Sequence, residues 1–131
     1  MKTVLCVGVV AGLVALTGCN VFDPDHTVIL SVPKIDAPAT VTAGTSFTVT
    51  VTVQTGGCRS FSRLEVQKFT TAVRVVPWGT DASVGNKNVL CPANIIDEPH
   101  EIRIDPPFSG PYEVTVEQGR LAPVRATIQV Q

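Results

Sequence analysis

Hydrophobic and polar residues alternate with a period of two along most of the chain beyond its first 25 residues. In "SFTVTVTVQ" (46–54), Phe47 and three valines share one face while the intervening threonines share the other. This alternation is typical of a half-buried antiparallel strand. The same pattern predicts further strands at 26–32, 61–69, 72–78, 100–105, 112–118 and 123–130.

Clusters of turn-forming residues separate these predicted strands, at 42–45, 55–57, 81–88, 106–111 and 118–120. Beyond the first 18 residues no segment shows a sustained apolar period of 3.6 residues. One-sided strands in this number need a second layer to cover their apolar faces. We therefore predict an all-β fold over 27–131, a single antiparallel sandwich of about seven strands with hairpin and Greek-key connections.

The first 18 residues follow a different pattern. Lys2 precedes a continuous apolar run from Val4 to Leu16. The run is too short and too rich in glycine to serve comfortably as a permanent membrane span. A positive residue followed by a short apolar core is typical of a helical export signal peptide that is removed, so we assign 1–18 to this role.

The segment Leu16-Thr17-Gly18-Cys19 resembles the lipobox of bacterial lipoproteins. The resemblance implies cleavage before Cys19 after its thiol has received a diacylglyceryl group. Two or more acyl chains give the stable anchoring that one chain does not. The alternative is a cysteine that merely follows a hydrophobic leader.

Residues 19–26 then form a lipidated N-terminus with a short polar tether. Fully extended, Asn20 to His26 reaches about 20–25 Å, so the domain is expected close to its membrane. Asn20 is not the aspartate associated with retention in the inner membrane. The resemblance therefore implies the outer membrane in a two-membrane cell, and the outward face of the cell membrane in a one-membrane cell.

The remaining charges and cysteines are few. Ten basic residues fall to nine without Lys2, against eleven acids, which leaves a net charge of about −2. The bases are scattered, so we expect no nucleic-acid partner. Cys58 and Cys91 remain once Cys6 and Cys19 are set aside. Such a pair usually oxidises outside the cytoplasm, closing a loop of about 34 residues; two free thiols or a metal pair are the alternatives.

Two stretches, "APATVTAGTSFTVTVTV" (37–53) and "PFSGPYEVTVEQG" (107–119), resemble bacterial immunoglobulin-like domains. The resemblance implies that Tyr112 forms a tyrosine corner with the preceding connection. No tryptophan stands at the family's central-strand position. Because Cys58 precedes a predicted strand and Cys91 lies in an irregular segment, we expect their bridge to pin a loop rather than to cross the core.

The acid-rich segment "IIDEPHEIR" (96–103) offers Asp97 and His100 to a cation. Proline interrupts it, and His100 and Glu101 point to opposite faces if a strand starts there. We therefore interpret it as a solvated loop leading to a histidine at the strand edge, with metal binding by Asp97, His100 and another acid as the alternative.

Trp78 is the only tryptophan and precedes a glycine. It either caps the core at the end of its strand or serves as a contact anchor for a protein or sugar partner. The extent of its burial decides between the two.

The chain has two histidines and no G-x-S-x-G, H-E-x-x-H or phosphate-binding glycine loop. We assign no catalytic residues, cofactor or metal and expect no enzyme activity. The favoured hypothesis is a protein-binding or structural module of the cell envelope, with an unidentified envelope protein as partner. An alternative, an inhibitor or sensor of an extracytoplasmic enzyme, predicts that loops 81–88 and 106–111 gather at one end near Trp78. Metal binding through Asp97 and His100 is the other.

Overall fold

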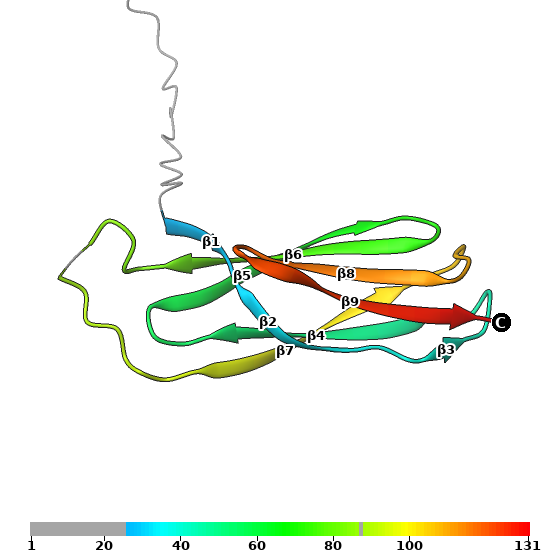
Figure 1. The fold of residues 1–131 in the computed structure, drawn as a ribbon, viewed down its shortest axis with the longest axis horizontal. Helices are drawn as coiled ribbons and strands as arrows, with labels where there is room; N and C mark the ends of the chain where they lie inside the picture. Colours follow the sequence, from blue (N-terminus) through cyan, green and yellow to red (C-terminus); the bar gives the residue numbers. More distant parts are fainter. Residues whose placement is uncertain (1–25, 87) are drawn as a thin grey trace, which may run out of the picture.

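The computed structural model describes residues 26–86 and 88–131, so residues 1–25, with the expected signal peptide and Cys19, lie outside it. The described chain is all-β and forms two packed sheets, which confirms the predicted sandwich (Figure 1). No helix among the described residues is long and apolar enough to cross a membrane. The strands are β1 (Thr27–Ile29), β2 (Ser31–Asp36), β3 (Thr40–Val41), β4 (Phe47–Thr55), β5 (Arg59–Lys68), β6 (Ala72–Asp81), β7 (Ile96–Ile104), β8 (Tyr112–Gln118) and β9 (Leu121–Val130).

The nine strands divide between a sheet of six and a sheet of three. In the larger sheet β6 pairs with β5, β1 and β8, and the order continues through β9 to β3; the smaller sheet has the order β2-β4-β7. Two pairings, β6 with β8 and β3 with β9, are parallel, which the prediction of an antiparallel sandwich missed. The β6–β8 pair is parallel because the chain crosses to the other sheet as β7 before it returns.

The first predicted strand, 26–32, is two strands in different sheets. β1 pairs with β6, β2 pairs with β4, and β3 then joins β9 in the larger sheet. The break falls at Leu30, whose N–H donates to the Pro77 carbonyl while its side chain is fully buried. This N-terminal segment closes one flank of the sandwich, which is why the fold has nine strands rather than about seven.

The core lies between the sheets and consists mainly of valine. The inward valines of β4 are fully buried, as the alternation predicts, and they face the valines of β6 and β8. Tyr112 closes the core at the end opposite the Cys58–Cys91 disulfide, where the rings of Phe47 and Phe108 meet it edge to face. Burial raises the pKa of its phenol.

The Tyr112 hydroxyl donates to the carbonyls of Ala72, at 2.9 Å, and Phe69, at 3.4 Å. Phe69 lies in the turn between β5 and β6, and Ala72 is the first residue of β6, so the expected tyrosine corner with the connection just before Tyr112 is wrong. The parallel pairing of β8 with β6 places the start of β8 beside the start of β6. Tyr112 therefore links the start of β8 to the start of β6 and the turn before it.

Candidate functional site

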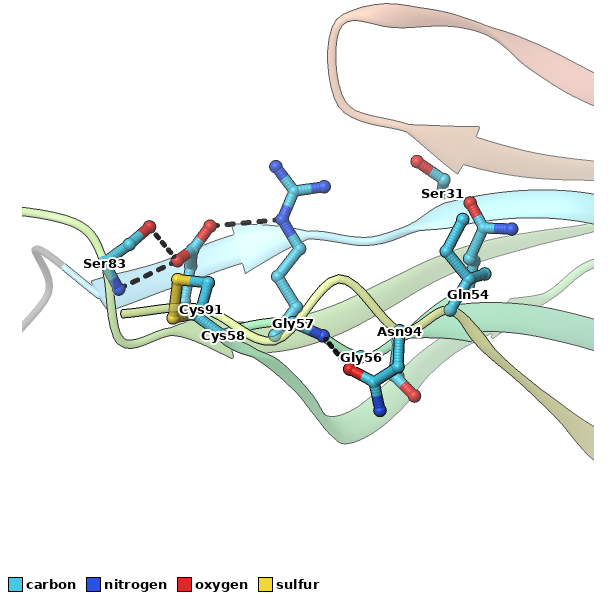
Figure 2. A pocket seen from close by; sticks show the side chains of 12 residues that line it. Ser31, Gln54, Gly56, Gly57, Cys58, Ser83, Cys91 and Asn94 are labelled. Carbon is cyan, nitrogen blue, oxygen red and sulfur yellow. Dashed lines mark hydrogen bonds and ion pairs between the residues drawn. A yellow bond between two sulfur atoms is a disulfide. The ribbon is translucent and has the colours of Figure 1, made fainter. Parts of the chain in front are cut away.

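The most varied group of polar side chains lies at the end of the sandwich that carries the disulfide. Cys58, in the turn from β4 to β5, is bonded to Cys91, in the segment between β6 and β7, and their Cα atoms are 5.0 Å apart. The bridge predicted from the cysteine count is confirmed, and it pins a loop to a turn. A hollow of about 330 Å³ lies beside it (Figure 2).

A glycine turn brings the loop close to the sheet in this hollow. Gly56 has φ of +100°, and a Cβ on it would run into the Asn94 carbonyl, so only glycine fits. The Gly57 N–H donates to the Asn94 side-chain oxygen at 2.9 Å (Figure 2). The "TGG" turn signal thus serves a second purpose, because it lets the loop after Cys91 lie against β4 and β5.

Asp81 is the buried carboxylate of this end. It accepts hydrogen bonds from the Ser83 backbone N–H and hydroxyl, and from Arg59 Nε at 3.1 Å. These bonds, those of Ser83 first, hold the pKa of Asp81 below its ordinary value. Sequence reasoning missed this cluster, although "DAS" is the signature of an aspartate that bonds to the backbone two residues on.

A larger hollow, of about 680 Å³, adjoins the first and shares Ser31, Arg59 and Asp81 with it. Strand β1 and the turn between β8 and β9 form its sides, and Arg120, Leu121 and Trp78 line it. We call this second hollow the Arg groove. Its two guanidinium groups can bind an anion or a carbonyl oxygen.

Trp78 is half-buried and borders the Arg groove. Its indole N–H donates to Glu65 Oε2 at 2.9 Å, and Arg63 Cζ lies 5.7 Å from the ring centroid. Both partners belong to β5, so the ring is held by polar side chains of the neighbouring strand. Trp78 is therefore neither a buried residue that caps the core nor a fully exposed contact residue.

Strand β7 begins at Ile96, so the solvated loop expected before His100 is wrong, whereas the strand predicted at 100–105 forms the second half of β7. It pairs with β4 in register from Ile96 opposite Thr55 to Ile104 opposite Phe47. Strand alternation places Asp97 and His100 on opposite faces. The structure does not bring these two candidate ligands together, and no group of three or more His, Cys, Asp or Glu side chains in the described ranges is arranged to hold a metal ion.

The two residues have separate surroundings. The Asp97 carboxylate accepts a hydrogen bond from Gln54 at 3.4 Å. The His100 ring stacks on Phe61 with centroids 3.9 Å apart, and its Nε2 lies 3.7 Å from Glu98 Oε2. Glu98 accepts from the Thr55 hydroxyl at 2.8 Å, so this carboxylate is already used inside the fold.

The loops expected to gather near Trp78 lie at opposite ends of the sandwich. The chain after Asp81 leaves β6 at the disulfide end, where the Ala82 N–H donates to the Cys58 carbonyl. Loop 106–111 meets the start of β6, since the Ser109 N–H donates to the Thr70 carbonyl. The geometric condition of the inhibitor or sensor hypothesis is therefore not met.

The flank between β5 and β7 exposes two strand edges of different character. Pro99 lies within β7 and supplies no N–H, and the Arg103 carbonyl accepts from Lys68 Nζ at 2.7 Å. Both features hinder the addition of another strand to β7. Strand β5 has ten residues, contains no proline and pairs only with β6 among the described strands.

Comparison with known proteins gives no match. No family model, no curated protein and no solved structure is detectably similar to this chain.

Proposed function

We propose that this chain is an extracytoplasmic lipoprotein, anchored to a membrane through Cys19, whose β-sandwich is a protein-binding or structural module of the cell envelope. The lipobox supports the anchor, and the Cys58–Cys91 disulfide is in keeping with an oxidising compartment outside the cytoplasm. The observation that carries the binding role is the open edge of β5.

The register of β5 against β6 identifies the backbone groups of that edge. Leu64 lies opposite Pro77, which has no N–H and whose carbonyl accepts from Leu30 on the other side of β6. Leu64 and Pro77 are therefore a pair without mutual hydrogen bonds, so the N–H and C=O of Leu64 point away from β6. By alternation those of Val66 and Lys68 point the same way, and together they offer a partner strand a ladder of hydrogen bonds.

Site-specific photo-crosslinking in intact envelopes tests this function. A photoreactive amino acid at Gln67, exposed on β5, is compared with one at Glu101, exposed on β7. We expect one defined protein adduct from Gln67 and none from Glu101. Equal adducts from both positions, or none from either in acylated protein, would contradict the proposal.

A backbone variant tests whether the partner adds a strand. Val66→Pro removes one outward N–H and no hydrogen bond to β6, since Val66 belongs to the outward set. The Gln67 adduct should then be lost while cooperative urea unfolding is retained. An adduct that persists in folded Val66→Pro would show that the partner does not pair with β5.

A further inference from the structure

Exposed apolar side chains gather at the disulfide end. The described residues leave five large hydrophobic side chains exposed, and four of them lie here: Leu90 (96% exposed), Ile95 (72%), Ile96 and Leu121. Ile95 lines the hollow beside the disulfide, and Leu121 lines the adjoining Arg groove. We call Leu90, Ile95, Ile96 and Leu121 the apolar end. Grouped exposure of this kind marks a protein or membrane contact.

The chain also joins the domain at this end. His26, the first described residue, lies beside the end of β6, with Nδ1 3.2 Å from the Asp81 carbonyl oxygen. Only the seven residues from Asn20 to His26 follow Cys19 before β1 begins. Even fully extended they reach only about 25 Å, so a lipid on Cys19 would hold His26, and the end of the sandwich beside it, within about that distance of the membrane surface.

Local charges allow contact with lipid. No acidic residue occurs between Asp81 and Asp97 in the sequence. Asp81 is paired with Arg59, and Asp97, which follows Ile96, is an exposed carboxylate that accepts a hydrogen bond from Gln54. Arg59 and Arg120 are exposed beside Leu121, where their guanidinium groups can meet lipid phosphates while apolar neighbours enter the acyl region.

We propose that the apolar end is a second membrane contact, in which Leu90, Ile95, Ile96 and Leu121 enter the boundary between headgroups and acyl chains of the bilayer that holds Cys19. This inference rests on the proposed lipid anchor. A lipid occupant is favoured over a protein because the anchor holds this end close to the bilayer. The sandwich then stands on the membrane by its disulfide end, and the β5 edge faces sideways toward other envelope components.

Photo-crosslinking with lipid detection tests the inference in intact cells. A photoreactive amino acid replaces Leu121 in one variant and Phe69 in another. The two side chains are matched in exposure, at 57% and 58%, and Phe69 lies in the turn at the opposite end. We expect lipid adducts, identified by mass, to be several-fold more abundant at position 121 than at position 69. A variant with the photoreactive group at Leu90 repeats the comparison in case one substitution disturbs folding.

Failure of this inference is distinguishable from failure of the anchor. Partition of each variant into a detergent phase, with Cys19→Ala as reference, reports acylation independently of the crosslinks. Acylated protein with equal lipid adducts at positions 121 and 69 overturns the membrane contact alone. A protein adduct in place of lipid at 121 and 90 assigns the apolar end to a protein and also overturns it. Wild-type protein that partitions like Cys19→Ala overturns the anchor and the inference built on it.

Discussion

The two ends of the sandwich are held together by different means. At the far end, the buried ring of Tyr112 packs against Phe47 and Phe108, and its hydroxyl donates to the carbonyls of Ala72, at the start of β6, and Phe69, in the turn before it. At the disulfide end, a covalent bridge and the Asp81 cluster hold a long segment whose described residues form no strand and expose apolar side chains. The far end thus continues the core, whereas the disulfide end is an ordered surface available for contact.

The largest expected effect comes from the far end. Tyr112→Ala removes the ring at the centre of the aromatic group and should lower the free energy of unfolding by about 3–5 kcal/mol. Tyr112→Phe keeps the ring and loses only the hydroxyl, so it should cost about 1 kcal/mol. Urea unfolding measures both. Equal losses in the two variants would show that the hydrogen bonds, not the packing, hold this end.

Removal of the disulfide should have a comparable but slightly smaller effect. Replacing Cys58 and Cys91 together by serine frees a loop of about 34 residues in the unfolded chain, a change worth about 3–4 kcal/mol. Amide hydrogen exchange should accelerate first between β6 and β7 while the amides around Tyr112 stay protected. Uniform acceleration along the chain would contradict the separation of the two ends.

The two ends also differ in how their carboxylates contribute at low pH. Hydrogen bonds from Ser83, then Arg59, lower the pKa of buried Asp81, and Arg103 with Ser46 lowers that of exposed Asp105. A carboxyl group whose pKa is lower in the folded state stabilises the folded protein when the pH is above the ordinary pKa of 3.8. This contribution to stability is lost as the pH falls through the lowered pKa.

Asp81→Asn should therefore cost about 1–3 kcal/mol at pH 7, because it removes the charge that strengthens the buried hydrogen bonds from Ser83 and Arg59. The cost should shrink as the pH falls through the lowered pKa of Asp81, where the wild-type carboxylate is itself protonated. Asp105→Asn should cost less at pH 7, since solvent and salt screen its exposed pair. Urea titrations of both variants over pH 2–7 give the comparison. A larger loss from Asp105→Asn would contradict the greater importance of the buried cluster.

The smallest stability effects are expected from exposed apolar residues. Leu121→Ser and Phe69→Ser should each change the free energy of unfolding by no more than about 0.5 kcal/mol. Only Leu121→Ser should weaken the association of the acylated protein with phospholipid vesicles, measured by flotation at increasing salt. Equal weakening by both substitutions would show that the two ends do not differ in their contact with lipid.

Sequence patterns predicted the interior of the fold well. The alternation of 46–54 gave β4 and its buried face because each inward valine must leave water. The turn at Gln118–Arg120 was predicted too, where Gly119 has φ of +64°. The cysteine count predicted the disulfide, since the proposed lipidation of Cys19 left one pair of cysteines in the domain.

Features that depend on long-range pairing were not predictable in this way. Asp97 and Pro99 are residue types that are common in loops. Pro99 is nevertheless tolerated in β7, because β7 is an edge strand and one of its sides needs no backbone N–H to pair with a neighbouring strand. The partners of Tyr112 and the pairing of Arg59 with Asp81 depend on which strands become neighbours. The candidate site was therefore less predictable than the core, and Asp97 with His100 did not form the suggested pair.

The mass of the mature protein shows whether Cys19 carries lipid. Intact-mass measurement of the wild type, with Cys19→Ala as control, should give a chain that begins at Cys19 and carries the added mass of a diacylglyceryl group, with or without a further acyl chain. The Cys19→Ala protein should lack that addition. A wild-type mature N-terminus without lipid would contradict the anchor, and with it the orientation of the apolar end toward the membrane.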